Sequence, residues 1–349
     1  MRIAITVDPY IPVPPREYGG IERVIDFLVR GLTERGHDVT LLAHPESCVP
    51  ARLLPYGKPP HRGWIPRATE LWQVGSRLWA SQREFDIVHS FGRLAALLPI
   101  LPLRGLPKIQ SYQRDAVPWR SVATAVRLAG ESIRFTGCSS SVYRNTACVG
   151  HWQTIFNGVD VRKYTLATHA FEDAPLVFLG RLHPVKGAHH AIAIAAAAGR
   201  RLVLAGNRVE TGDAAGYFER AIAPHVDGTR VRYVGALDDA AKNQVLGSAA
   251  ALLMPVEWEE PFGIVMAEAM ACGTPVIGFA RGSIPEIVRD GVNGFLCHNV
   301  GEAAAAVPRL GTIDRAAVRA DCVARFSATA VVDAYERLYR QMRAQVPAR

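Results

Sequence analysis

The sequence lacks the features that mark a membrane-spanning, secreted or disulfide-bonded protein. No run among its 349 residues approaches the roughly 20 apolar residues that span a bilayer. The first eight residues are too short, and too soon interrupted by Asp8, for a signal peptide, and we expect them to form a strand. The six cysteines include no C-x-x-C pair and no metal-ligand spacing, which is typical of reduced thiols in a cytosolic chain. We therefore expect a soluble, cytoplasmic protein.

Acidic residues are scarce in the first half of the chain. Residues 1–165 hold 21 Lys and Arg against 13 Asp and Glu, whereas residues 166–349 hold 19 of each kind. The excess is densest in residues 52–144, with 14 basic and 5 acidic side chains. This charge favours an anionic partner, such as a lipid surface or a phosphorylated acceptor, unless it is only a solvated arginine-rich surface. We expect no nucleic-acid partner, because no recognition motif or aromatic platform accompanies the charge.

Segments typical of β-strands alternate with segments of helical period along almost the whole chain. This alternation predicts an α/β fold with a parallel, doubly wound sheet, and it occurs twice. The expected strands are residues 2–7, 38–42, 86–89, 107–112, 133–138, 175–180, 201–205, 230–234, 250–254, 275–279 and 294–297. The expected helices include residues 20–34, 121–130, 186–199, 213–224, 238–248 and 263–272.

The periodic pattern breaks near residues 160–174, and a chain of this length is long enough for two domains of ordinary size. We expect one Rossmann-like domain at residues 1–165 and a second at residues 170–327. Two further helices are expected near the end of the chain. The last, at residues 328–345, presents one apolar face made of Val331, Tyr335, Leu338, Tyr339 and Met342.

The most informative run is EPFGIVMAE, from Glu260 to Glu268. It follows a short apolar strand at residues 249–255 and opens a helix at residues 264–272. Free backbone N–H groups at a helix start favour an anion, and the two carboxylates can accept hydrogen bonds from hydroxyl groups. The combination suits a sugar nucleotide, although either carboxylate alone could simply complement the helix dipole. The other candidate donor-binding residues of this run are Phe262, Gly263 and Ile264.

Two more turns point to a nucleotide. Arg181 and Lys186 stand five positions apart in a turn between a strand and a helix, a pattern that suits a diphosphate and removes the need for a divalent metal. The same pattern could be an ordinary surface turn. Asp238 and Asp239 follow another strand and are expected to cap a helix rather than bind a metal.

The run from Glu260 to Glu268 resembles the Glu-(seven residues)-Glu signature of the retaining glycosyltransferases of family 4, which have the GT-B fold of two Rossmann-like domains facing across a cleft. The resemblance covers nearly all of the chain and is strongest in residues 175–300. It implies that Glu260 lies by the donor sugar, that Glu268 binds the ribose, and that Arg181 and Lys186 stabilise the departing nucleoside diphosphate. It also implies that the last helix crosses back to the first domain. Further donor-binding candidates that it implies are Gly19, Gly20, Asn207, Val234, Gly235 and Leu237.

The acceptor half departs from the family in two places. Many members end one strand with His-x-His, but the second position is Phe91 here, after His89. A strand that usually ends Thr-x-His has Gln113 in the last place. His89 remains a catalytic candidate, although a lone His at a strand end is as often structural.

Residues 65–82 form a predicted helix with Leu71, Trp72, Leu78 and Trp79 on one face, and with Arg67, Arg77 and Arg83 nearby. Such a face could contact a membrane interface or line a groove for a lipid acceptor. More often, however, such a face is buried in the core.

The sequence thus predicts a retaining, metal-independent hexosyltransferase without a cofactor. It would move a sugar from a nucleotide-diphosphate sugar, UDP- or GDP-linked, to a hydroxyl acceptor in glycolipid, polysaccharide or other glycoconjugate synthesis. We also expect an acceptor that is anionic or lipid-linked. We expect the protein to lie peripherally at the inner face of the membrane, as a monomer or weak dimer. Two alternatives remain, namely an epimerase of the same fold and a non-catalytic sugar-nucleotide-binding subunit.

Overall fold

The computed structural model describes residues 1–16, 19–57, 64–114, 117–144 and 149–345, without the side chains of residues 64–67. The chain forms two compact units. The N-terminal domain comprises Met1–Asn157 together with the segment from Ala328 on, and the C-terminal domain comprises Gly158–Ser327.

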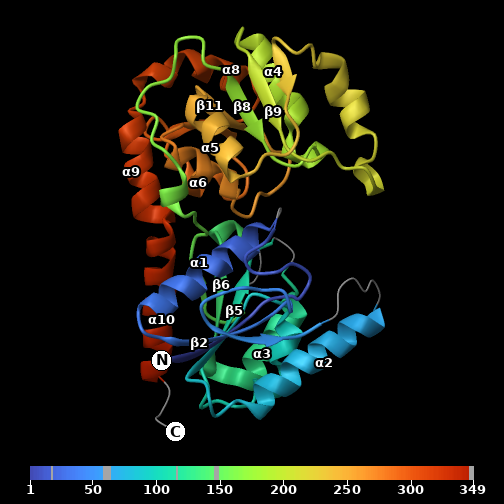
Figure 1. Ribbon diagram of the computed structural model, residues 1–349, viewed down its shortest axis with the longest axis vertical. Coiled ribbons are helices and arrows are strands. Elements are labelled where there is room, and N and C mark those ends of the chain that lie inside the picture. Colours follow the sequence, from blue (N-terminus) through green and yellow to red (C-terminus); the bar gives the residue numbers. More distant parts are fainter. Residues whose placement is uncertain (17–18, 58–63, 115–116, 145–148, 346–349) are drawn as a thin grey trace. The chain divides into compact units, whose positions relative to one another are not determined.

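The N-terminal domain is built on a parallel sheet (Figure 1). Among its described residues, seven strands lie in the order β3-β2-β1-β4-β5-β6-β7, and every pair is parallel. The inner strands are buried on both faces, where they carry mostly apolar residues, as expected for a parallel sheet covered by helices. The strands are β1 Arg2–Thr6, β2 Asp38–Ala43, β3 Arg52–Pro55, β4 Ile87–Ser90, β5 Lys108–Tyr112, β6 Ile133–Gly137 and β7 Trp152–Thr154. The helices are α1 Gly20–Glu34, α2 Trp64–Ala80, α3 Trp119–Ala129 and α10 Ala328–Gln345.

The C-terminal domain has the same kind of sheet. Six parallel strands among its described residues follow the order β10-β9-β8-β11-β12-β13. They are β8 Leu176–Leu179, β9 Leu202–Ala205, β10 Val231–Tyr233, β11 Ala251–Met254, β12 Val276–Phe279 and β13 Gly294–Cys297. The helices are α4 Ala188–Ala197, α5 Asp239–Ser248, α6 Ile264–Ala271, α7 Ile284–Ile287, α8 Val300–Ala306 and α9 Arg315–Phe326. The predicted class, an α/β protein with two doubly wound parallel sheets, is confirmed.

The helix α10 is the one long segment that joins a domain from far along the sequence. Its predicted apolar face is buried, including Tyr335 and Tyr339, which are almost completely inaccessible. It packs on α1, where Gly31 leaves room for Val332: a Cβ at Gly31 would lie 2.8 Å from a Val332 methyl group (Figure 1). The last helix therefore completes the core of the N-terminal domain.

One predicted helix, at residues 213–224, is broken in the structure. A 3-10 turn at Gly212–Ala214 is followed by a π-helical stretch at Phe218–Ile222 and a second 3-10 turn at Ala223–His225. Gly216 has a left-handed backbone, with φ of 72°, which interrupts a helix. Pro224 lies in the second 3-10 turn and lacks the N–H donor that a continuing helix would use.

The helix α2 does not have the single apolar face that the sequence predicted. Leu78 is fully buried and Leu71 is half-buried, but Trp72 and Trp79 are 74% and 50% exposed. Residues seven apart share a face, and neighbouring residues are turned by about 100° from each other. The two leucines therefore face the core while the two tryptophans point to solvent. The predicted neighbour Arg67 has a side chain outside the described part.

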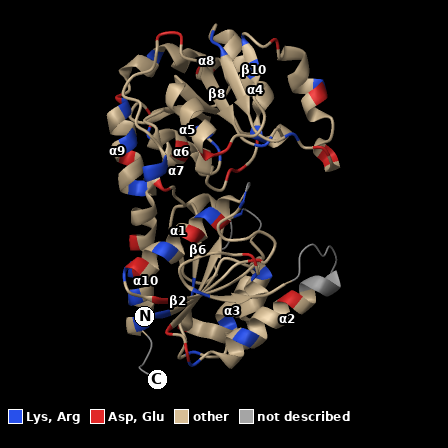
Figure 2. Ribbon diagram, viewed as in Figure 1, with Lys and Arg blue, Asp and Glu red and all other residues tan. Residues whose placement is uncertain are grey.

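Among the described residues of the first half, the basic side chains do not form one free surface. Lys108 is buried, and its ammonium group donates to the carbonyl groups of Leu103 and Leu106. Arg52 and Arg134 pair with nearby acidic side chains. Figure 2 shows Lys and Arg spread over helices and loops with Asp and Glu among them. Part of the basic charge is thus buried, as at Lys108, or paired with acidic side chains of the same domain.

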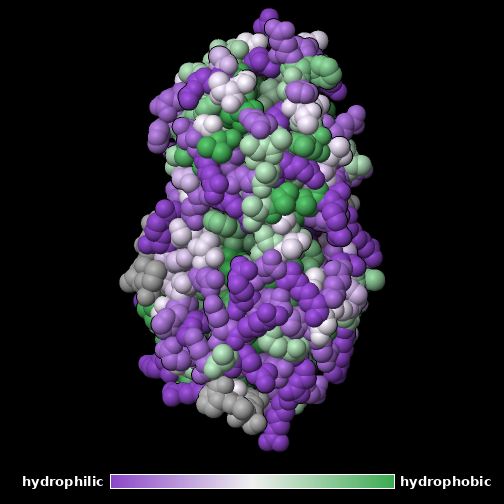
Figure 3. Space-filling model, turned by 90° about the vertical axis from the view of Figure 1, so that its left-hand side faces the viewer, coloured by the Kyte–Doolittle hydropathy of each residue, from purple (hydrophilic) through white to green (hydrophobic). Residues whose placement is uncertain are grey.

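Hydrophilic side chains cover most of the face shown in Figure 3, with hydrophobic ones in smaller patches between them. None of the helices that the structure describes combines the length and hydropathy needed to cross a bilayer. The cysteines at positions 48, 138, 272, 297 and 322 are free thiols.

Candidate functional site

Two loops of the C-terminal domain meet where its strand order reverses, between β8 and β11. The loop at residues 180–187 follows β8, and the loop at residues 255–263 follows β11. Gly187 allows them to touch, because its φ is 76° and a Cβ there would lie 1.9 Å from the Pro255 carbonyl oxygen. In open parallel sheets, ligands bind beyond the carboxyl ends of the strands at such a reversal point.

Lys186 and Glu260 form the ion pair that connects these loops. The Lys186 Nζ donates to Glu260 Oε2 at 2.6 Å and lies 4.5 Å from the centre of the Trp258 ring. The Trp258 indole N–H donates to the same carboxylate oxygen at 3.0 Å. Glu260 is only 5% exposed, and its carbonyl oxygen accepts from the Ser283 amide at 2.8 Å. The carboxylate is thus fixed from several sides, and Lys186 keeps further N–H donors beyond this bond.

Glu268 lies on α6 with two partners that the sequence did not indicate. The Tyr164 hydroxyl donates to Glu268 Oε1 at 2.9 Å, and Lys242 Nζ donates to the same oxygen at 2.6 Å. Glu268 is 4% exposed and Lys242 is largely buried. Nothing in the sequence joins these residues, because Tyr164 lies 104 positions before Glu268. The only local signal was the place of Lys242 in the first turn of the helix that Asp238 caps.

Arg181 is exposed at the start of the loop after β8. His183, which sequence reasoning did not single out, caps the short turn that carries Lys186: its Nδ1 accepts from the Val185 amide at 3.3 Å. Burial, and then the charges of Arg181 and Lys186, lower the pKa of His183. The imidazole therefore stays neutral, as it must to accept this hydrogen bond. The signal that could have found it is its position three residues before Lys186.

The start of α6 has the backbone that the sequence predicted for an anion site. Gly263 precedes the helix in a left-handed conformation, with φ of 69°, and Ile264 is the first helical residue. Phe262 is buried against Phe326, with ring centres 5.7 Å apart. Phe262 therefore anchors the loop in the core, while the amides after it form the open end of the helix.

The remaining candidates of the C-terminal domain lie at the ends of β9 and β10. The Asn207 carbonyl accepts from the Leu182 amide at 2.9 Å, and the Gly235 carbonyl accepts from the Gly206 amide at 2.7 Å. These bonds join the loops after β8, β9 and β10 into one edge. Val234 and Leu237 are half-buried beside them. Asp238 caps α5 by accepting from the Ala241 amide at 2.8 Å, which confirms the predicted helix cap.

The other three candidates belong to the N-terminal domain. Gly19 precedes α1 and Gly20 is its first residue. His89 is completely buried: its Nδ1 pairs with the Tyr339 hydroxyl and its Nε2 with the Ser111 hydroxyl, both at 2.6 Å. Burial lowers the pKa of His89 to about 3. This placement favours the structural alternative for His89, because neither ring nitrogen faces solvent.

A polar cluster at the end of β1 was missed by sequence reasoning. The Arg93 guanidinium donates to the Tyr10 hydroxyl at 2.6 Å, and Tyr10 donates to Glu70 Oε2 at 2.7 Å. Asp8 lies 3.9 Å from Arg93, and burial raises the pKa of Asp8 more than Arg93 lowers it. The strand order of this sheet reverses between β1 and β4, so the cluster occupies the ligand-binding edge. The signal available in the sequence was a carboxylate directly after the first strand.

Two family profiles match the chain. The profile described as "Glycosyl transferases group 1" matches residues 168–313, and that described as "Glycosyltransferase Family 4" matches residues 18–163. Together they cover most of both domains.

Known proteins with similarity to most of the chain include enzymes of this kind. A phosphatidyl-myo-inositol mannosyltransferase of Propionibacterium freudenreichii is 27% identical over 337 residues, covering 88% of this chain and 84% of its own. The solved structure of AviGT4, a glycosyltransferase involved in avilamycin A biosynthesis, is 26% identical, with a TM-score of 0.71 and 98% of each chain covered. The Anabaena protein HepE, solved with UDP-glucose, shares the fold at 18% identity, with a TM-score of 0.71 over 98% of this chain and 100% of its own.

Proposed function

Because the chain belongs to the group 1 glycosyltransferases of family 4, we propose that it moves a hexose from a nucleotide-diphosphate sugar to a hydroxyl acceptor, with retention at the anomeric carbon and without a metal. The observation that carries this proposal is the Lys186–Glu260 pair at the reversal point of the sheet. It places a cation that can bind a diphosphate beside a fixed carboxylate that can accept from sugar hydroxyls.

The site must stabilise the negative charge that develops on the leaving diphosphate. When the bond between the anomeric carbon and the phosphate oxygen breaks, its electron pair stays with the diphosphate. In this proposal, Lys186 and the exposed Arg181 supply positive charge to that oxygen, and the free amides at Gly263 and Ile264 at the start of α6 can donate to it. These groups can stabilise the charge without an ion. The departing phosphate takes the proton of the acceptor hydroxyl as the new bond forms on the same face.

The two carboxylates have separate tasks in this proposal. Glu260 is held by Lys186 and Trp258, so its direction is set before the sugar binds. Glu268 accepts two bonds on Oε1, and its other oxygen is the acceptor for the ribose hydroxyls. Lys242 and Tyr164 therefore position Glu268 rather than react.

The N-terminal domain supplies the acceptor side. The cluster of Asp8, Tyr10, Glu70 and Arg93 offers both donors and acceptors at its ligand-binding edge, which suits a polyhydroxy acceptor with an anionic group. A glycolipid, polysaccharide or other glycoconjugate would meet this requirement. The similar mannosyltransferase is named for a phosphoinositide substrate, which supports the same class.

We also propose that the protein works in the cytoplasm and touches the inner face of the membrane through Trp72 and Trp79, which lie exposed on one face of α2. Flotation with anionic phospholipid vesicles tests this contact. The wild-type chain should float with the vesicles, and the Trp72→Ala/Trp79→Ala double variant should bind at least tenfold less. Equal binding of both proteins would remove the proposed membrane contact and leave the transferase assignment intact.

A ligand screen tests the donor. The melting temperature of the full chain should rise with one of UDP, GDP or ADP and with the matching sugar nucleotide, since a ligand at 100 times its dissociation constant adds about 2.7 kcal/mol. The purified protein should then slowly hydrolyse that donor. Conversion of donor to an isomeric sugar nucleotide without acceptor would instead identify an epimerase, and binding without any turnover would identify a non-catalytic subunit.

A further inference from the structure

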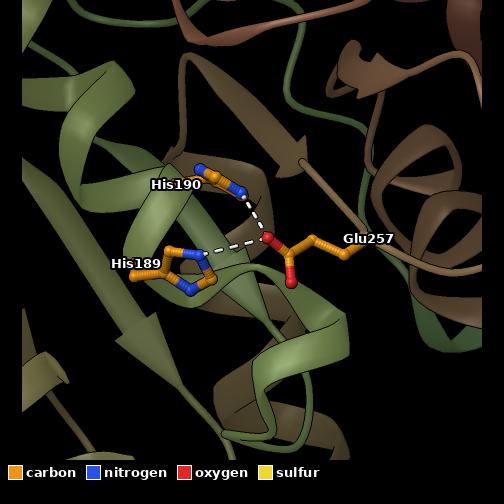
Figure 4. A group of neighbouring side chains, drawn as sticks. All are labelled: His189, His190 and Glu257. Atoms are coloured by element: carbon orange, nitrogen blue, oxygen red, sulfur yellow. Dashed lines mark hydrogen bonds and ion pairs between the residues drawn. The ribbon is translucent and has the colours of Figure 1, made fainter. Parts of the chain in front are cut away.

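Two neighbouring histidines and a glutamate converge outside the proposed transfer chemistry. His189 and His190 lie in the first turn of α4, and Glu257 lies in the loop after β11 (Figure 4). His190 Nε2 is 2.8 Å and His189 Nε2 is 3.5 Å from Glu257 Oε1. One ligand atom from each residue lies within 4.8 Å of the others, and no other group of three such residues is found in the described part of the chain.

The surrounding structure fixes these side chains in place. The Glu257 amide donates to the Val185 carbonyl at 2.9 Å, and the Glu257 carbonyl accepts from Arg281 Nη1 at 3.0 Å. The Tyr217 hydroxyl pairs with His189 Nδ1 at 2.7 Å, so His189 turns its Nε2 toward the carboxylate. A partner on the second ring nitrogen that sets the direction of the first is the usual arrangement around a metal-binding histidine.

The chemical types of the three side chains also suit a metal. The imidazole rings of His189 and His190 are only 4.1 Å apart between centres. Metals bind imidazole nitrogens, and the Glu257 carboxylate provides an anionic ligand beside the two rings.

We propose that His189, His190 and Glu257 bind one Zn²⁺ ion, or a first-row transition ion with the same ligand preference. Two imidazoles and one carboxylate are a known zinc ligand set that leaves the fourth position to water. Bonds of about 2.0–2.1 Å in a tetrahedron place ligand atoms about 3.3–3.4 Å apart. The 3.5 Å separation of His189 from Glu257 fits that spacing, the 2.8 Å separation of His190 from Glu257 must lengthen by about 0.5 Å, and all three ligand atoms lie within 4.8 Å of one another.

The ion would join two segments of the C-terminal domain. Its histidines follow Lys186 by three and four residues, and Glu257 precedes Glu260 by three. The ion therefore cross-links the loops that the Lys186–Glu260 pair already connects, without using either of those side chains. Its expected effect is to stabilise the folded C-terminal domain, and it takes no part in the transfer reaction.

Zinc binding to the full chain tests the proposal directly. The protein is stripped with a chelator, and Zn²⁺ is titrated in competition with a chromophoric chelator. A Cys48→Ser background is used because Cys48 is an exposed thiol. We expect one ion per chain and a rise in melting temperature. His190→Ala and Glu257→Gln should each weaken binding by at least tenfold, while His225→Ala and His298→Ala, which remove exposed histidines elsewhere in the domain, should leave it unchanged.

Tyr217→Phe separates a built site from a chance cluster. It keeps all three ligands but removes the bond to His189 Nδ1, and loss of such a partner weakens metal binding by about 10–100-fold. The melting curve of each metal-free variant shows that it is folded, and Glu257→Gln, which keeps the side-chain volume, serves if His190→Ala does not fold. Absence of stoichiometric binding, or equal affinity in wild type, His190→Ala and Glu257→Gln, would overturn the proposal.

Discussion

The two domains share one strand plan but fill its ligand-binding edge differently. In both sheets the order reverses beside the first strand, between β1 and β4 in the N-terminal domain and between β8 and β11 in the C-terminal domain. The C-terminal edge carries two buried carboxylates, Glu260 and Glu268, each paired with a lysine. The N-terminal edge instead carries a neutral histidine buried under α10 and a separate polar cluster around Arg93. The same strand plan thus supports one edge with two buried lysine–carboxylate pairs and another with a buried histidine and a cluster of polar side chains.

The two edges differ in what holds their polar side chains in place. Glycine at positions 187 and 263 shapes the C-terminal loops, and the charged side chains sit on those loops. In the N-terminal domain, His89 is held by Ser111 and by Tyr339, which is 250 residues away. The first arrangement depends on short loops, and the second depends on packing of a distant helix.

The largest effect should come from replacing Gly187 by alanine. The left-handed backbone at this position disfavours a Cβ, and the Cβ would lie 1.9 Å from the Pro255 carbonyl oxygen. Strain and overpacking together should cost about 3–4 kcal/mol of unfolding free energy. Calorimetry should show the transition of the C-terminal domain at a lower temperature while that of the N-terminal domain stays unchanged. Gly199→Ala, with φ of 64° and no atom within 4 Å, is the matched control and should cost only about 1 kcal/mol.

The next effect concerns the charge at the C-terminal edge. Lys186→Ala should lower kcat by at least about 100-fold, which corresponds to about 2.7 kcal/mol, because it removes a cation from the departing diphosphate. Arg201→Ala is the control, since Arg201 pairs with Asp173 on the surface of the same domain. Steady-state rates with the donor identified by the ligand screen provide the measurement. A Lys186→Ala variant within threefold of wild type would show that the two edges do not differ in the way proposed.

The sequence predicted the local elements of the C-terminal edge, namely the helix start after Gly263 and the cap at Asp238, because they lie in short runs. The spacing of Glu260 and Glu268, the turn at Gly263 and the cap at Asp238 are each visible within ten residues. The partners of the carboxylates were not visible. Lys242 and Tyr164 reach Glu268 only through the folding of α5 and the segment before β8.

The N-terminal edge was harder to predict for the same physical reason. Whether His89 reacts or packs depends on α10, and no local pattern links the two segments. The α2 helix shows a second limit, because Trp72 and Leu78 are both large and apolar but face opposite environments. Periodicity locates a stripe of apolar residues but does not say which part of a broad stripe the core covers.

The pH dependence of stability tests whether His89 is buried as a neutral imidazole. In the unfolded chain the imidazole takes a proton below a pKa of about 6.5, whereas in the folded domain its pKa is about 3. The unfolded state therefore binds more protons between these values, and stability is lost as the pH falls through this window. Between pH 7 and pH 5 the loss from this residue should be about 2 kcal/mol. Denaturation curves of His89→Gln, measured at several pH values, should show an unfolding free energy that falls by about 2 kcal/mol less than that of the wild type between pH 7 and pH 5.

The same variant gives an activity test at pH 7.5. If His89 is structural, kcat of His89→Gln should stay within about threefold of wild type at a temperature where the variant is folded. A loss of 100-fold or more with normal folding would return His89 to the catalytic groups. Both edges would then carry a side chain that acts in the reaction.

The smallest effect should come from removing the charge of Glu268, the carboxylate assigned to the ribose. Glu268→Gln should raise KM for the donor about tenfold with little change in kcat, because a charge-assisted bond to the ribose contributes to substrate and transition state alike. Lys242→Met should have a similar effect, because it removes the ammonium group that donates to Glu268 Oε1 at 2.6 Å and so holds the carboxylate in position. If Lys242 acts only through Glu268, the double variant should be no worse than either single variant. Glu219→Gln, an exposed control in the same domain, should change neither constant. Additive losses in the double variant would mean that Lys242 contacts the donor itself.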